Sequence, residues 1–353
     1  MADSGTSLRG RVRGLLGRRR RRYIATATTV GLVLMVVVAG PLGGARALRC
    51  GVFGGCRPAV TPLLEPPRLR PLSALDVATQ GGYVALGDSY SAGEGAYQIP
   101  ADLAPANRCH RTSSSYFHTI AETFRFQRGE AFWACSGATT DDVLRGRDAE
   151  PPQLDRVTAD TSLVTLSIGG NDVGFAHVLA GCVVRFPWSR GCQSQGPEID
   201  TRMRALRATL WNVLSKIIVR APLARVIVVG YPRIFSETSG ADFDNITVGD
   251  QRWLNVRAKA LDDLIGQVAQ AADRRIVAAH GAGSVEYVDA LYAFAGHEIG
   301  TKDPFVNGLD VNLSALSVEA RSFHPKPAGY RRLAQLVTQQ ITNGPRRTIL
   351  QYR

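Results

Sequence analysis

From Gly82 to about Ile341 of this 353-residue chain, short apolar runs alternate with longer amphipathic stretches. The short runs have the length of buried strands, and the long ones carry apolar residues at helical spacing. Strands separated by helices favour a parallel sheet covered by helices on both faces. The expected strands are 83–86, 131–134, 163–168, 226–229 and 285–288, and the expected helices are 113–126, 200–219, 250–272 and 327–341.

Polar motifs that contain glycine directly follow three of these expected strands. One starts at Gly87, one includes Gly137, and one ends in Asn171 and Asp172. Ligands of parallel sheets bind beyond the carboxyl ends of the strands. We therefore expect the three motifs to gather at one edge of the sheet.

The first motif, GDSYSAGEG at 87–95, places Ser89 on a turn between a strand and a helix. A serine hydroxyl is a poor nucleophile unless a base takes its proton, and glycines at such a turn let a substrate approach the backbone. Taken alone, the motif is equally well explained by a turn in which Ser and Asp cap the next helix. The G-x-S-x-G elbow of other hydrolases is absent around Ser89.

Three further segments carry candidate catalytic groups. Asn171, in SIGGNDVGF, has an amide that can donate to a developing oxyanion, although capping asparagines are common in turns. Gly137, in ACSGA, can present a backbone N–H, although a plain turn held by a disulfide explains it too. His324, in FHPKPAGY, lies just before the last expected helix. A single histidine is more often structural, and the other five keep that interpretation.

Taken in chain order, these four blocks resemble those of the SGNH (GDSL) hydrolase superfamily, and most closely those of exported actinobacterial lipases and esterases. The resemblance covers roughly Gly82 to Ile341. It implies a three-layer α/β/α, flavodoxin-like fold with a central parallel sheet. It also implies that Ser89 is the nucleophile and His324 its base, with an oxyanion hole built from Ser89, Gly137 and Asn171.

One position departs from the family pattern. The family usually has an aspartate three residues before the histidine, and this chain has Arg321 there. A guanidinium cannot accept a hydrogen bond from Nδ1–H of the imidazole. The resemblance therefore predicts a Ser–His dyad in which the main-chain carbonyl of Arg321 or Ser322 orients the ring. A distant acid, Glu319 or Asp310, is the alternative.

The N-terminal region predicts export. Residues 1–47 hold nine arginines and one acid, which leaves only +4 of the formal charge of +12 for the rest of the chain. The basic block precedes an apolar run at 24–40 and an A-x-A site at 45–47. This order is typical of an export signal, or of an uncleaved anchor that holds the protein at the outer face of the plasma membrane. No basic face interleaved with aromatics follows, so no nucleic-acid partner is expected.

The domain organisation follows from this pattern. Residues 1–47 are expected to be the signal or anchor, 48–80 a proline-rich linker, and 81–345 the SGNH hydrolase domain. The chain has six cysteines, an even number that suggests disulfides in an exported protein. Sequence alone allows about 15 connectivities. The simplest pairs neighbours: Cys50–Cys56, Cys109–Cys135 and Cys182–Cys192. The spacing does not favour a zinc site.

The expected function is a secreted serine esterase or lipase that works without a metal or organic cofactor on a lipid or acylated small molecule. Val173, Gly174 and Phe175, with Phe186 and Trp188, are candidates for an apolar wall along an acyl chain, although packing in the core explains them as well. The alternatives are a deacetylase of cell-wall or polysaccharide esters, and a weakly catalytic lipid- or glycan-binding protein on the same fold. A membrane-anchored acyltransferase is a further rival, but no donor site is recognisable.

Overall fold

The computed structural model describes residues 71–351, except for 184–190, 244 and 313–316. The expected signal or anchor, the Cys50–Cys56 pair, most of the linker, and Phe186 and Trp188 lie outside the described residues. Among the described helices, none combines the length and the apolar character that a bilayer-spanning helix needs.

A five-stranded, all-parallel sheet forms the centre of the described structure, with strand order β2-β1-β3-β4-β5. Each strand overlaps its prediction, with small shifts at the ends. Strand β3 is buried along its whole length, as expected for a sheet covered on both faces. The strands are β1 (Gly82–Gly87), β2 (Glu130–Phe132), β3 (Thr161–Ser167), β4 (Arg225–Val229) and β5 (Ser284–Val288).

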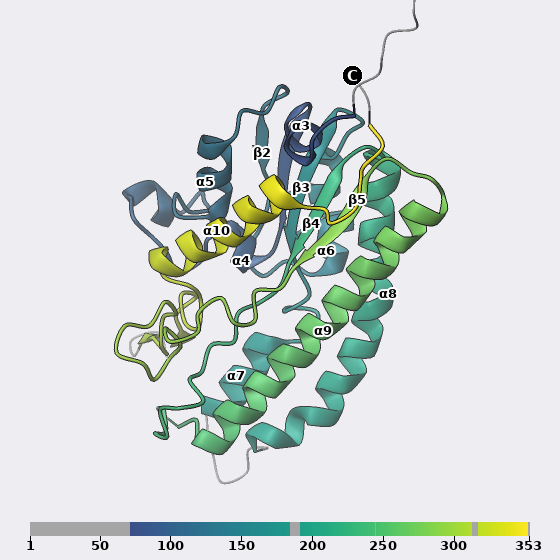
Figure 1. Ribbon diagram of the computed structural model, residues 1–353. Helices are drawn as coiled ribbons and strands as arrows, with labels where there is room; N and C mark the ends of the chain where they lie inside the picture. The colour runs from purple at the N-terminus through teal and green to yellow at the C-terminus, as the bar shows by residue number, and fades with distance from the viewer. Residues whose placement is uncertain (1–70, 184–190, 244, 313–316, 352–353) are drawn as a thin grey trace, which may run out of the picture. The chain divides into compact units, whose positions relative to one another are not determined.

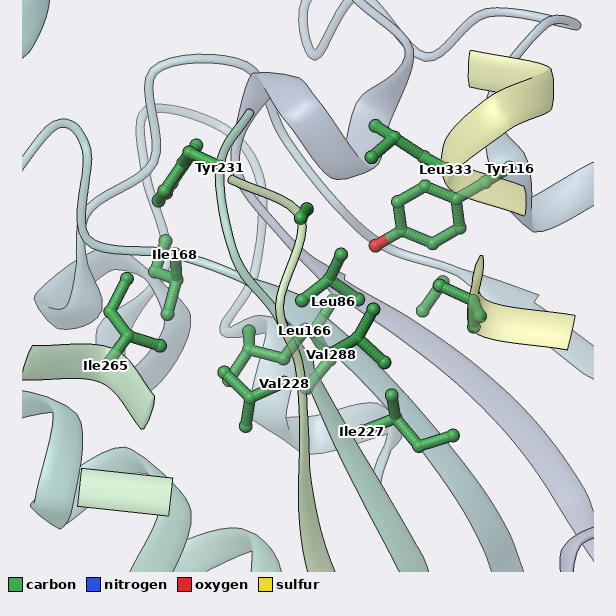
Figure 2. Close-up of a cluster of buried hydrophobic side chains, with 14 of the residues drawn as sticks. Leu86, Tyr116, Leu166, Ile168, Ile227, Val228, Tyr231, Ile265, Val288 and Leu333 are labelled. Atoms are coloured by element: carbon green, nitrogen blue, oxygen red, sulfur yellow. The ribbon is translucent and has the colours of Figure 1, made fainter. Parts of the chain in front are cut away.

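Helices cover both faces of this sheet (Figure 1), which confirms the three-layer α/β/α prediction. Helix α10 packs against α3, α5, β4 and β5, while the long pair α8 and α9 lies together on the other face. Apolar side chains of neighbouring strands, including Leu86, Leu166 and Val228, form the core (Figure 2). The longer helices are α3 (Ala74–Thr79), α5 (Tyr116–Thr123), α6 (Thr140–Arg145), α7 (Phe175–Val183), α8 (Gly196–Arg220), α9 (Val248–Ala278) and α10 (Pro327–Asn343).

Short elements sit in the loops between these. They are α4 (Ser89–Ala92), four-residue 3₁₀ turns at Pro100–Leu103, Gln153–Arg156 and Cys192–Gln195, and the antiparallel pair β6 (Val311–Asn312) and β7 (Ser317–Val318). The sequence analysis did not predict α7 or the β6–β7 pair. Both lie on the side of the molecule to which the strands point their carboxyl ends, where they contribute to the cavity described below.

The hydrolase domain extends beyond the expected limits at both ends. Residues 73–80, expected to be linker, instead form and cap α3, because Ser73 and Asp76 make a reciprocal capping box and Val77 is fully buried. At the other end, the side chain of Gln351 donates to the carbonyls of Leu223 and Ala282 at 2.7 Å. The prolines of residues 48–80, and the absence of a periodic apolar pattern there, therefore did not indicate where the folded domain begins.

A buried ion pair joins the layers at the end of the sheet where β4 and β5 begin. Arg225 is fully buried and makes two hydrogen bonds to Glu286, at 2.7 and 2.8 Å. Its remaining N–H groups donate to the carbonyls of Ala74, Gln340 and Ile341. One guanidinium thus connects two strands to α3 and to the end of α10.

Candidate active site

Ser89 lies where β1 ends and α4 begins. Asp88 caps this helix, since its carboxylate accepts a hydrogen bond from the amide of Tyr90 at 3.0 Å. Gly87 has a φ of +126°, and a Cβ there would lie 2.3 Å from the carbonyl oxygen of Ser167. A glycine is therefore required for the sharp turn that presents Ser89 at the edge of the sheet.

His324 comes from the turn before α10, and its Nε2 lies 2.8 Å from Oγ of Ser89. The other ring nitrogen, Nδ1, lies 3.0 Å from the carbonyl oxygen of Ser322. The carbonyl of Arg321 instead accepts from the backbone amide of His324, at 3.1 Å. Burial lowers the pKa of His324 below its usual value, so the ring is neutral, and able to accept a proton, at neutral pH.

The two distant acids considered above lie in other surroundings. Asp310 forms an ion pair with Arg321, the residue at the position where the family usually has an aspartate. The carboxylate of Asp310 is therefore paired with this arginine. Glu319 lines the cavity wall, and its backbone amide donates to the carbonyl of Asp310 at 2.8 Å. The ring of His324 thus has a backbone carbonyl, rather than either of these acids, at hydrogen-bonding distance of Nδ1.

Gly137 and Asn171 lie beside Ser89 and line the same cavity. The amide nitrogen of Asn171 donates to the carbonyl of Ala138 at 2.9 Å, which fixes the orientation of its side chain. The carboxylate of the next residue, Asp172, accepts from the amide of Thr140 at 3.0 Å. These bonds join the third motif to the second, so the strand-end motifs meet at one edge, as the topology predicts.

Several residues that hold these groups in place were not predicted from the sequence. The hydroxyl of Tyr231 donates to Asp88 at 2.5 Å and accepts from the amide of Gly170 at 3.0 Å. Burial raises the pKa of Asp88 to about 7. Tyr231 lies two residues beyond the end of β4, so the strand-end rule applied to the fourth strand would have found it.

The turn that carries His324 is fastened in the same way. The hydroxyl of Tyr90 donates to the carbonyl of Phe323 at 2.9 Å. Asn307 donates to the carbonyl of His324 from its backbone amide, at 2.9 Å, and from its side chain, at 3.0 Å. Phe323 itself has a φ of +61°, which is rare outside glycine and asparagine. No sequence motif marks these contacts, because they join segments that are separate in the chain.

An apolar cavity of about 350 Å³ opens beside this group of residues. Ser89, Gly137, Asn171 and His324 lie at its wall, together with apolar side chains from α7, α9 and the segment that contains β7. Of the expected apolar wall, Phe175 lines the cavity, whereas Val173 is buried in the core. The apolar residues are Phe175, Ala176, Leu179, Ala180, Val183, Ile234, Leu254, Ala258, Leu261, Leu309, Val318 and Phe323.

Two disulfides flank the cavity. Cys109–Cys135 joins the segment after α4 to the loop that carries Gly137, and the amide of Cys135 donates to the carbonyl of Gly87 at 2.9 Å. Cys182–Cys192 joins the end of α7 to the 3₁₀ turn before α8. Both pairings are those of the neighbour scheme.

Comparison with known proteins agrees with this geometry. A family model described as the GDSL-like lipase/acylhydrolase family matches residues 85–332. Lipase 1 of Streptomyces coelicolor is 34% identical over 258 residues, which cover 72% of this chain and 85% of that protein. A lipase of Streptomyces rimosus is 34% identical over 248 residues, or 70% of this chain and 81% of the relative.

Solved structures give the same result. Phospholipase A1 of Streptomyces albidoflavus superposes with a TM-score of 0.61 at 31% identity, covering 74% of this chain and 99% of that one. The extracellular lipase of Streptomyces rimosus superposes with a TM-score of 0.60 at 29% identity, covering 73% and 99%. The chain therefore belongs to the GDSL-like lipase/acylhydrolase family, and it is a carboxylic ester hydrolase with the SGNH fold.

Proposed function

We propose that this protein is an exported lipase or carboxylesterase in which Ser89 and His324 hydrolyse esters through an acyl-enzyme. The observation that carries the proposal is the 2.8 Å contact between Nε2 of His324 and Oγ of Ser89 at the wall of an apolar cavity. A neutral imidazole at this distance is placed to take the hydroxyl proton as the oxygen attacks a carbonyl carbon.

The reaction runs in two halves. Oγ of Ser89 bonds to the ester carbon as His324 takes its proton, and the oxyanion accepts hydrogen bonds from the amide of Asn171 and the backbone N–H groups of Ser89 and Gly137. Each such donor typically lowers the barrier by roughly 3 kcal/mol. His324 then protonates the departing alcohol. A water molecule repeats the sequence on the acyl-enzyme, which releases the acid and the serine hydroxyl.

In this proposal the carbonyl of Ser322 orients the imidazole. It lies 3.0 Å from Nδ1, so an N–H there donates to it and leaves Nε2 free to accept from Ser89. A neutral carbonyl stabilises the imidazolium less than a carboxylate does. The pair is thus a dyad as far as direct hydrogen bonds to the ring are concerned.

A fluorophosphonate is expected to label Ser89, because the activated oxygen displaces fluoride and forms a stable phosphonate ester. Peptide mapping by mass spectrometry identifies the modified residue. Ser91 provides an internal control, since it lies two positions away but is fully buried and bonded to Tyr116 at 2.6 Å. Labelling at another serine, or equal labelling of His324→Ala, would contradict the assignment.

The cavity supports a fatty-acyl substrate in preference to an acetyl group. Its volume of about 350 Å³ is far more than a two-carbon group fills, and its walls away from Ser89 are largely apolar. Cavities of this size and character are typical of small-molecule sites. The phospholipase A1 relative, named for an acyl ester of a lipid, agrees with such a substrate.

Filling the cavity is expected to shift the preference towards short acyl chains. Ala258 on α9 lines the cavity, so Ala258→Phe should lower kcat/KM for p-nitrophenyl laurate at least tenfold relative to p-nitrophenyl butyrate. The reason is that space for a single methylene already changes the discrimination between two substrates by roughly 10- to 200-fold. The matched control is Val256→Phe, because Val256 lies on the same helix but is 64% exposed. An unchanged laurate-to-butyrate ratio in Ala258→Phe would place the acyl chain elsewhere.

Export is supported by three observations. The first 47 residues have the order of a basic block, an apolar run and an A-x-A site. Two disulfides flank the cavity, and such bonds persist outside the cytoplasm. One structural relative is an extracellular lipase. N-terminal sequencing of the exported protein distinguishes a cleaved signal from an anchor at residues 24–40.

A further inference from the structure

A fully buried carboxylate belongs to the turn that carries Ser89 and has no part in the mechanism described so far. Glu94 follows α4, and its side chain has no exposed surface. Oε2 lies 2.5 Å from Nδ1 of His110, and the hydroxyl of Tyr97 donates to Oε1. Burial alone would raise the pKa of Glu94, but these hydrogen bonds hold it below the usual value, so the group is an anion at neutral pH.

The backbone of Glu94 is built into the same turn as Ser89. Its amide donates to the carbonyl of Ser89 at 3.1 Å. The hydroxyl of Tyr330 lies within hydrogen-bonding distance of both carbonyls, at 2.9 Å from that of Glu94 and 3.2 Å from that of Ser89. These bonds fix the backbone of Glu94 relative to the nucleophile, while His110 and Tyr97 hold its carboxylate.

The next residue brings this turn against His324. A Cβ added to Gly95 would lie 2.9 Å from Cβ of His324, and the carbonyl of Gly95 accepts from the side chain of Asn307, which also donates to the carbonyl of His324. The Glu94–Gly95 backbone therefore packs directly on the segment that carries the imidazole.

Because Arg321 occupies the position where relatives of this fold usually have an acid, the imidazolium formed in each half-reaction lacks a carboxylate partner at Nδ1. We propose that Glu94 is a positioning residue that supplies this negative charge through space, from the turn that carries Ser89, and stabilises the imidazolium of His324. The proposal rests on the proposed roles of Ser89 and His324.

The electrostatics of the surroundings agree with it. Burial lowers the pKa of His324. Among the influences that raise this pKa, the negative charge of Glu94 has a larger effect than the hydrogen bonds to the carbonyls of Ser322 and Ala320. His110 acts in the opposite direction, since its own positive charge lowers the pKa of His324. The other titratable or charged side chains near the two groups, in the described residues, are Tyr90, Tyr97, Asp310, Glu319, Arg321 and Tyr330.

Two substitutions are expected to move the titration of His324 in opposite directions. Glu94→Gln removes the anion, so the pKa of His324 should fall and the acid limb of kcat/KM should move to lower pH. His110→Asn removes a cation and keeps a donor, so the acid limb should move to higher pH; asparagine also tolerates the φ of +47° at this position. We expect kcat of Glu94→Gln to fall about tenfold with KM nearly unchanged, far less than the ~10⁴-fold loss from altering an acid bonded directly to the histidine.

The opposite signs separate an electrostatic role from a structural one. A merely loosened turn would shift both profiles the same way, and that result would overturn the proposal. Glu298→Gln is the matched control, because Glu298 is also buried and forms an ion pair with Arg233 at 2.7 Å. This substitution should leave the pKa of His324 unchanged. An equal shift in Glu298→Gln would likewise overturn the proposal.

Titration of the His324 ring by NMR in the Ser89→Ala background needs no turnover. In this background, Glu94→Gln should lower the pKa of the His324 ring and His110→Asn should raise it. That result would support the electrostatic interaction between Glu94 and His324 even if Ser89 is not the nucleophile. If neither moves it, the role of Glu94 fails while the assignment of Ser89 and His324 is unaffected. Should Glu94→Gln fold poorly, the His110→Asn titration alone decides, since an unmoved or lowered pKa contradicts the proposal.

Discussion

Replacing Ser89 with alanine is expected to lower kcat for p-nitrophenyl ester hydrolysis by about 10⁵-fold or more, because the acyl-enzyme cannot form without its oxygen. His324→Ala should lose nearly as much, and the double variant should be no worse than either single one. Groups that act as one unit show this lack of additivity. Steady-state kinetics on short- and medium-chain esters measure all three.

The melting temperature of each variant serves as the control for correct folding in this experiment. Alanine removes one hydroxyl at Ser89, so the melting temperature should change little, whereas the activity should vanish. Ser91→Ala is the matched variant, since Ser91 lies in the same helix but bonds Tyr116 and the amide of Ser167 instead of His324. Retained activity in Ser89→Ala, or fully additive losses in the double variant, would refute the dyad.

Replacing Arg225 with methionine is expected to destabilise the fold by about 3–5 kcal/mol, because the buried carboxylate of Glu286 loses its cationic partner and keeps only the neutral donors Ser284 and Gln340. The carbonyls of Ala74, Gln340 and Ile341 lose their donors in the same step. Urea unfolding followed by circular dichroism gives the free energy of unfolding. Since Arg225 starts β4 and the active site lies beyond the other end of the strands, kcat of the folded variant should stay near that of the wild type.

Two further variants separate charge from packing. Arg225→Met combined with Glu286→Leu removes both charges and should recover much of the loss, since apolar pairs often replace buried ion pairs without penalty. Arg220→Met breaks an ion pair whose arginine is 41% exposed, and it should cost less than about 1 kcal/mol. A loss in Arg225→Met as small as that in Arg220→Met would show that the buried pair contributes little.

The layered fold was predictable because its signals are local. Most of the sheet strands contain a short apolar run that can be recognised by itself, and each long helix has an apolar stripe. Arg225 shows the limit of this approach. Its strand was expected to start at Val226, because an arginine is rarely buried, and only the three-dimensional structure supplies the partners that allow it.

The site was predictable to the extent that it consists of short blocks at strand ends. Ser89, Gly137 and Asn171 follow three strands, and the topology alone brings them to one edge. Tyr90 and Asn307 hold the turn of His324, and Tyr330 bonds to the carbonyls of Ser89 and Glu94. These residues carry no such signal, because each bonds to a backbone atom of a segment that is distant in sequence. Similarly, no pattern in the sequence marks Glu94 as buried, and its partner His110 was expected to be an ordinary structural or surface histidine.

The long separation between the two reacting side chains bears on when the enzyme becomes active during its synthesis. Ser89 precedes His324 by 235 residues, and the latter lies on the segment that leads into the last helix. A chain still being made, or cut short before that segment, contains the nucleophile without its base. If Ser89 and His324 act as proposed, a partially synthesised chain is therefore inactive, and ester hydrolysis begins only after the segment that leads into α10 has docked.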